Sequence, residues 1–173
     1  MIGRRLIALA ALVSMAGCYR SARSYVGLSS HAEHCQEAVR RCEAAPSAWC
    51  QAAGDCHEHP TVGDRALGRA LSYYQRGCEG GDGHSCIATA ALRLLEGGPR
   101  DVEDAKACFE RACDLYADFC EIGARALEGR WVAIPPDPVR AAALRDAGRV
   151  HAAGPARPPP RDCPRPPVRA ISR

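Results

Sequence analysis

The sequence predicts an all-α protein, an α/α superhelical solenoid of helical hairpins bridged by disulfides. Composition is the first reason, since 6 Ile, 9 Val and 2 Thr stand against 32 Ala in 173 residues. Sheets need β-branched and aromatic side chains, so this composition excludes a β-sandwich or barrel. The second reason is the 11 cysteines, most of which recur at a regular interval. With only 5% aromatic residues, we expect a thin core that cross-links must reinforce.

Six cysteines define the repeat. They form three pairs, and the first cysteines of the pairs are Cys42, Cys78 and Cys113. These three are 36 and 35 residues apart. A second cysteine follows each after eight or seven residues, and these are Cys50, Cys86 and Cys120. A period of this length indicates stacked helical hairpins. In this interpretation the first cysteine ends one helix, the second opens the next, and a disulfide closes the hairpin at its tip.

Apolar spacing and end signals place the helices. Apolar residues three and four apart predict helices over 86–96 and 101–119. Asp101 is the expected N-cap of the second of these, and Asp137 that of the last helix, which has Pro138 at its first position. Gly54 is expected to interrupt the short second helix of the first hairpin.

These signals divide the chain into parts. The repeat domain is expected over residues 31–152, with units at about 31–60, 64–100 and 101–136 and a terminal helix at 137–150. Residues 153–173 form a tail rich in Pro and Arg, in which arginines recur every four residues. Such a composition predicts an extended or disordered segment, unless Cys163 pins it.

Four further cysteines are expected to form two more disulfides. Cys35 and Cys56 are nearly symmetric about the centre of the first hairpin, which favours a bridge between them. Elimination then pairs Cys108 with Cys163, a bond that would tie the tail to the repeats. A Cys108–Cys113 bond, or a bond between the Cys163 residues of two chains, would contradict this last pairing.

The N-terminus is expected to direct export. Residues 1–17 hold two arginines followed by an apolar run over residues 6–16, which is too short to span a bilayer. The sequence Met-Ala-Gly before Cys18 resembles a bacterial lipobox, which implies cleavage before Cys18 and lipidation of its thiol. An ordinary secretory signal is the alternative. Either one exports the chain, leaving ten cysteines in an oxidising compartment, so we expect a disulfide framework.

After cleavage, residues 18–30 would tether the domain to a membrane. Tyr19 follows the lipidated cysteine, where Asp would suggest inner-membrane retention, so the resemblance favours the outer membrane. The expected location is therefore a membrane-anchored lipoprotein that faces the periplasm.

The charged residues favour no ligand class. The formal net charge is +3, from 22 Arg and a single Lys against 20 acidic residues. No predicted helix carries a basic stripe, so nucleic acid is not an expected partner. Tyr73 and Tyr74 are expected to pack in the core. Solvated helix surface is the expected role of five arginines: Arg125, Arg130, Arg140, Arg145 and Arg149.

Two segments resemble a known family. They are ALGRALSYYQRGCEGGDGHSCIATAALRLLEGG at residues 66–98 and DVEDAKACFERACDLYADFCEIGARALEG at residues 101–129. Both resemble Sel-1-like repeats, which are related to the tetratricopeptide repeat. They are most similar to the cysteine-rich branch, the Hcp β-lactamase-like proteins, whose repeats carry a Cys-x7-Cys bridge. The likeness covers residues 64–149 well and residues 31–60 through cysteine register only, and Cys120 comes one residue early.

The resemblance implies two functions. Most Sel-1-like proteins are adaptors that hold protein partners or assemble envelope complexes, whereas the cysteine-rich branch is also described as binding and slowly hydrolysing penicillins. We expect a non-catalytic envelope lipoprotein that binds a protein or peptide as a repeat scaffold. A cysteine-rich Sel-1-like β-lactamase or penicillin-binding protein is the alternative.

The sequence contains none of the known catalytic motifs of β-lactam hydrolases. Serine enzymes use Ser-x-x-Lys, but Glu103 stands three residues before Lys106, the only lysine. The zinc motif His-x-His-x-Asp-His matches only at its first three positions, at residues 57–59. We therefore expect no catalytic residue and no cofactor.

One group of residues resembles a metal site, and it consists of His31, His34, Cys35, Cys56, His57 and His59. Closure of the first hairpin would bring them near one another, and short His-rich tracts can bind Zn or Cu. Oxidised cysteines cannot ligate, however, and exposed histidines are common in turns. We therefore expect no metal ligand here.

Overall fold

The structure is a computed structural model that describes residues 28–46, 48–60, 65–96, 99–130, 135–153 and 160–165. The chain divides into two compact units, Met1–His34 and Cys35–Arg173. The export signal expected at residues 1–17 and the lipidation expected at Cys18 lie outside the described residues. Within the described residues, no helix combines the length and the apolar character that crossing a bilayer requires.

The described residues form helices and no strand, as predicted. The helices are α2 (Leu28–Ala44), α3 (Trp49–Glu58), α4 (Leu67–Glu79), α5 (Gly83–Glu96), α6 (Pro99–Leu115), α7 (Ala117–Arg125) and α8 (Pro138–Ala153). A π-helical turn, η1 (Ala126–Arg130), follows α7. It contains Gly129, whose φ of 79° lies in the left-handed region that glycine tolerates.

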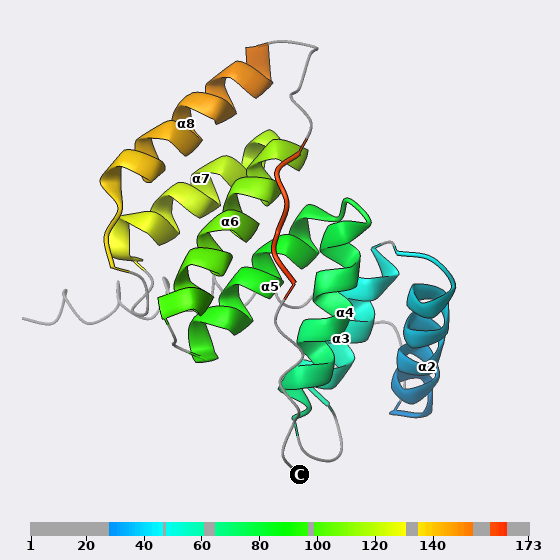
Figure 1. Ribbon diagram of the computed structural model, residues 1–173. Helices are drawn as coiled ribbons and strands as arrows, with labels where there is room; N and C mark the ends of the chain where they lie inside the picture. The colour runs from blue at the N-terminus through cyan, green and yellow to red at the C-terminus, as the bar shows by residue number, and fades with distance from the viewer. Residues whose placement is uncertain are drawn as a thin grey trace, which may run out of the picture. The chain divides into compact units, whose positions relative to one another are not determined.

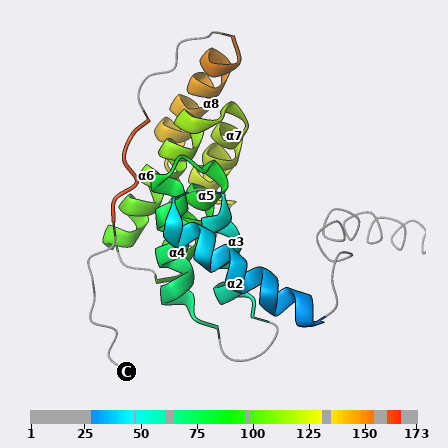
Figure 2. The same ribbon diagram turned by 90° about the vertical axis from the view of Figure 1, so that its right-hand side faces the viewer.

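Within the second unit, each helix from α3 onward packs against the next one along the chain. Figure 1 shows α4 to α8 following one another as a stack, and Figure 2 shows the same order from the side. This sequential packing of antiparallel helices is that of an α-solenoid, so the predicted fold class is confirmed.

The core is thin and made largely of Ala and Cys. The main cluster runs from α4 to α8, and its largest fully buried apolar side chains are Phe109 and Leu127. A smaller cluster joins α2 to α3 around Ala38 and Ala53, and another joins α4 to α5 around Tyr74. Small side chains let the helices approach closely but bury little area, so cross-links contribute a larger share of the stability.

Five disulfides cross-link the second unit. Three close hairpin tips, and they are Cys42–Cys50, Cys78–Cys86 and Cys113–Cys120. A fourth, Cys35–Cys56, joins α2 to α3 a second time. The fifth, Cys108–Cys163, joins α6 to the C-terminal tail. The same five pairs are expected from the sequence, three from the repeat period, one from hairpin symmetry and one by elimination. The third tip has the shorter spacing, and its Cα atoms lie 4.3 Å apart.

The single helix expected over 101–119 is wrong. α6 ends at Leu115, α7 begins at Ala117, and Tyr116 between them is extended, with φ −145° and ψ 127°. No glycine or proline marks this turn, and Phe119 happens to continue the apolar spacing of α6. In addition, α6 begins at Pro99, so Asp101 lies inside its first turn and is not the N-cap.

Other boundaries also differ from expectation. α2 begins at Leu28, three residues before the expected start of the domain at residue 31. α3 continues through Gly54, where an interruption is expected from the sequence. The start of α8 agrees with prediction, because the Asp137 carboxylate accepts a hydrogen bond from the backbone N–H of Arg140 at 3.1 Å.

Candidate functional site

Residues 160–165 of the tail lie against α4, α5 and α6 without helical or strand structure (Figure 1, red segment). Cys163 anchors them, since it is buried and bonded to Cys108 of α6. The tail is therefore pinned in the way the sequence allowed. We call the residues that hold it the tail seat, and they are Gln75, Glu79, Arg93, Cys108, Glu110, Arg111 and Asp114.

The tail seat recognises the main chain of the segment. Three of its side chains donate hydrogen bonds to carbonyl oxygens: Gln75 to Cys163 at 2.9 Å, Arg111 to Arg161 at 2.8 Å, and Arg93 to Pro164. Proline lacks an N–H, so a proline-rich segment offers mainly acceptors. A surface lined with donors is complementary to such a segment.

Carboxylates of the tail seat hold two arginines of the segment that are four residues apart. The Arg161 guanidinium donates to both oxygens of Asp114, at 2.8 and 2.7 Å, and its backbone N–H donates to Asp114 at 2.9 Å. Arg165 donates to both oxygens of Glu79, at 2.6 and 2.8 Å. Such two-pronged pairs fix the geometry as well as the charge, so they set the register of the segment.

Asp114 is the acidic centre of the seat. Its burial alone would raise its pKa, but the hydrogen bonds from the Arg161 side chain and backbone outweigh burial. The pKa of Asp114 therefore lies below its usual value of 3.8. The Arg161 contacts therefore favour the charged carboxylate, which links its titration to the position of the tail.

Arg93 forms the floor of the tail seat and is only 1% exposed. Its Nη1 lies 2.6 Å from the Asp104 carboxylate, and its Nη2 donates to Gln75 at 3.4 Å. Among the described residues, its Nε is the one buried side-chain nitrogen or oxygen without a hydrogen-bond partner. The floor of the seat is thus a buried guanidinium whose Nε–H donor has no hydrogen-bond partner among the described residues.

An open cavity of about 410 Å³ continues from the Arg165 end of the tail seat. Glu43, Tyr73 and Arg76 line its far side. The Tyr73 hydroxyl donates to Glu43 at 3.3 Å, and burial together with this carboxylate raises the pKa of Tyr73. Arg76 donates to the carbonyl of Glu43, so its charge is already engaged. The cavity beside Arg165 is therefore lined by polar and charged residues that also expose apolar surface.

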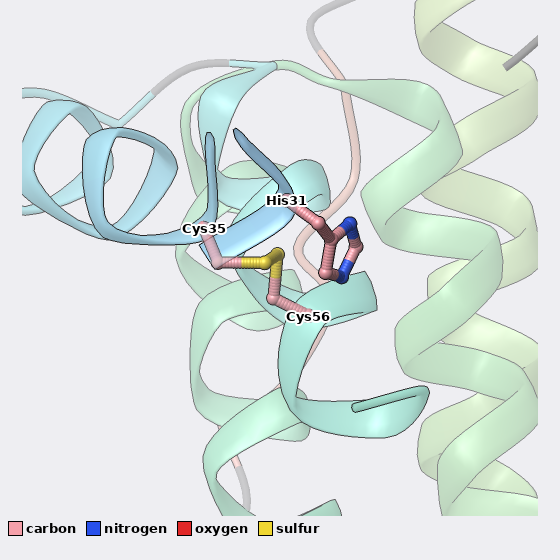
Figure 3. A group of neighbouring side chains, drawn as sticks. All are labelled: His31, Cys35 and Cys56. Carbon is pink, nitrogen blue, oxygen red and sulfur yellow. A yellow bond between two sulfur atoms is a disulfide. The ribbon is translucent and has the colours of Figure 1, made fainter. Parts of the chain in front are cut away.

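The residues considered for a metal site are engaged in other contacts. Cys35 and Cys56 are bonded to each other, and Figure 3 shows this disulfide together with His31, which lies one helical turn before Cys35 on α2. The His57 ring stacks on Tyr73 with centroids 5.3 Å apart. A thiolate site at these cysteines would require the disulfide to be reduced.

A second group of metal-ligand type lies at the other end of the stack. Cys113, Cys120 and His151 are buried, with ligand atoms within 4.8 Å of one another. Here too the two sulfurs form a disulfide, and His151 Nδ1 lies 3.1 Å from the Cys113 carbonyl. The arrangement fastens α8 to the third hairpin tip.

The five arginines expected on solvated helix surface, between residues 125 and 149, lie in ion pairs or on exposed surface. The pairs are Arg125 with Glu121, Arg140 with Glu103 and Glu110, Arg145 with Glu121 and Glu128, and Arg149 with Asp146. Arg130 is exposed. Tyr74 is buried as predicted, and its hydroxyl donates to Asp55 at 2.6 Å and to Glu58 at 2.9 Å. Tyr73 is only partly buried and lines the cavity.

Sequence reasoning found the Cys108–Cys163 bond but missed the rest of the tail seat. Its polar residues sit on three helices about 18 residues apart and share no motif. One signal was present, because Arg93 stands between Leu92 and Leu94 in the apolar second half of its helix. A charge at such a position needs a buried partner. No protein family, curated protein sequence or solved structure matches this chain in comparisons with known proteins.

Proposed function

We propose that the protein is a non-catalytic repeat scaffold that binds an extended segment of another protein. The observation that supports this most is the seating of residues 160–165. There a run of six residues without regular structure is held through its carbonyl oxygens and two arginines by three consecutive helices. A rigid, cross-linked stack that holds one extended segment has the geometry needed to hold another.

The proposed setting is the bacterial envelope, with the chain anchored by a lipid on Cys18 and facing the periplasm from the outer membrane. Five disulfides support an exported, oxidising location. Metabolic labelling with an alkyne fatty acid tests the anchor. We expect label on the wild type and none on Cys18→Ser, whereas equal labelling of both would contradict lipidation at this residue.

Site-specific photo-crosslinking tests the scaffold function. A benzophenone side chain replaces exposed Ser72, which lines the cavity beside Arg165, in the full-length protein in cells. Val139 on α8, which is 79% exposed, is the control position. We expect a discrete protein adduct from position 72 that is absent from position 139. Adducts from neither position, or equal adducts from both, would contradict partner binding in the open cavity beside Arg165.

The alternative, β-lactam hydrolysis, has a direct test of its own. The oxidised protein is mixed with a chromogenic cephalosporin, with heat-killed protein as the control. We expect no turnover above the control. Turnover that reduction of the disulfides abolishes would replace the scaffold proposal with the enzymatic one.

A further inference from the structure

We infer that the tail seat is a peptide-binding site that the chain's own residues 160–165 occupy in the oxidised protein. Cleavage of Cys108–Cys163 frees this site for a partner segment that is extended, rich in proline and carries two arginines four residues apart. This inference rests on the proposed scaffold function and names the chemistry of the partner and the event that admits it.

The contacts define that chemistry. The donors Gln75, Arg93 and Arg111 reach carbonyl oxygens, which every peptide has, so they select an extended backbone rather than a sequence. Sequence selection comes from the two carboxylates Asp114 and Glu79, which hold arginines at the first and fifth positions. Proline favours the extended form before binding and so reduces the entropy lost on binding.

The seat keeps its shape when the tail leaves. The Cys78–Cys86 bond joins α4 to α5, and the Arg93–Asp104 ion pair joins α5 to α6. Neither contact involves the tail. The donors and carboxylates of the seat therefore remain in place, and loss of the tail leaves their hydrogen bonds open to another segment.

The Cys108–Cys163 bond differs from the other four in what it joins. Each of the others connects two packed helices, so after reduction the two thiols stay side by side and can bond again. Cys163 lies on a segment without regular structure, and its thiol can move away from Cys108. After reduction, the Cys108 and Cys163 thiols can therefore separate, and the disulfide does not readily form again.

The chemical step is thiol–disulfide exchange with a dithiol reductant. The first thiolate of the dithiol attacks the Cys108–Cys163 bond and forms a mixed disulfide, and its second thiolate then displaces the protein sulfur. The dithiol loses two electrons and two protons and becomes a disulfide. Cys108 and Cys163 gain them and become thiols.

A peptide titration of full-length variants tests the binding site. The probe is a fluorescent peptide of residues 158–168 with serine in place of Cys163, so that no mixed disulfide forms. The first variant carries Cys108→Ser and Cys163→Ser, and the second adds Arg161→Glu to weaken the competing tail. We expect no saturable binding to the oxidised wild type and at least tenfold tighter binding to the second variant than to the first, because a tethered segment competes at about millimolar effective concentration.

Two matched pairs test the contacts. A peptide with Arg161→Glu should bind the second variant at least tenfold more weakly than the parent peptide. Gln75→Leu in that variant should also weaken binding, whereas Val139→Ala, at an exposed position of α8 outside the seat, should leave it unchanged. Circular dichroism and the intact mass, with four disulfides retained, show that each variant is folded. Failure of a folded second variant to bind, or binding that ignores the arginines, would overturn the peptide site.

Stepwise reduction tests the release. Wild-type protein is treated with rising dithiothreitol, its thiols are alkylated, and the labelled peptides are mapped by mass spectrometry. We expect Cys108 and Cys163 to be labelled before the tip cysteines, and peptide binding to appear with that label. Earlier opening of a tip disulfide would overturn the gating by this bond. A protein adduct at position 72 without peptide binding would leave the scaffold function standing with a different ligand.

Discussion

Gly54 lies inside α3 because the ring of Tyr74 fills the space that a side chain would need. A Cβ at this position would overlap Tyr74 Cε1 and would lie 2.7 Å from Cζ. The ring is fully buried and is fixed by its hydroxyl, so it cannot move aside freely. We expect Gly54→Ala to lower the free energy of unfolding by about 1–3 kcal/mol through overpacking, measured by urea denaturation.

Gly68 is the matched control for this substitution. It also lies within a helix, near the start of α4, but it is exposed. Gly68→Ala should leave packing unchanged and raise the free energy of unfolding by up to about 1 kcal/mol through helix propensity. A gain in stability at both glycines would show that the Tyr74 ring does not constrain Gly54.

Asp114 supplies a prediction about pH. Its folded pKa lies below 3.8 because Arg161 outweighs burial, so its contribution to stability is fully present above 3.8 and is lost as the pH falls through the lowered value. In Arg161→Gln, burial remains without the guanidinium, and the pKa of Asp114 should rise relative to the wild type. Carboxyl chemical shifts in an NMR titration measure both values. An unchanged titration would show that Arg161 does not hold this carboxylate in solution.

At Gly54 and Arg93 the sequence could not be interpreted from local rules alone. Gly54 suggests a helix break from propensity, yet a contact with Tyr74, 20 residues away, decides its conformation. The charge of Arg93 alone suggests an exposed residue, although its leucine neighbours indicate burial. In the structure Asp104 neutralises the charge and the tail covers it. In both cases tertiary contacts override the intrinsic preference of the residue.

Among the elements, the hairpin tips give the clearest account of how the chain compensates for its thin core. Cys78–Cys86 closes a loop of eight residues between α4 and α5, which share a small apolar cluster around Tyr74. Replacement of both cysteines by alanine should lower the free energy of unfolding by about 2–3 kcal/mol in the chain-entropy model. Urea denaturation measures the loss, and circular dichroism without urea should show unchanged helix content. A loss below about 1 kcal/mol would show that strain in the native bridge cancels its effect on the unfolded chain.

How well each helix is predicted from the sequence depends on whether its ends carry recognisable signals. α5 and α8 carry clear end signals, such as the Asp137 N-cap, and their predicted ranges overlap the observed ones closely. The turn at Tyr116 has no such signal, so the apolar spacing predicts one helix where the structure has two. The Cys113–Cys120 spacing already required a turn at that place, because a helix tip must lie between two bonded cysteines.

At the scale of the whole molecule, the cysteine period predicted the stack of hairpins, since a repeated unit must pack against its neighbours in order. The course of the tail was not predictable from its composition, which suggests an extended chain without contacts. One residue, Cys163, carried the information that it returns to the repeats, and the hydrogen bonds that seat it arise only once three helices are stacked.

Arg93 links three helices and the tail. From its place on α5, its buried guanidinium contacts α4, α6 and the tail. Asp104→Ala removes its countercharge and leaves the cation buried, so the free energy of unfolding should fall by about 3–5 kcal/mol. The double variant Arg93→Met with Asp104→Leu removes both charges and keeps the apolar volume, and it should be more stable than Asp104→Ala alone.

Urea denaturation of the disulfide-intact proteins compares these two variants with the wild type. Arg93→Met alone completes the cycle and gives the coupling energy between the two side chains. The double variant also loses the donor to the Pro164 carbonyl, so hydrogen exchange of the Arg161 backbone N–H should accelerate even where global stability is recovered. Equal losses in Asp104→Ala and in the double variant would mean that Arg93 contributes through its packed stem rather than its charge, and its role in the tail seat would then be steric.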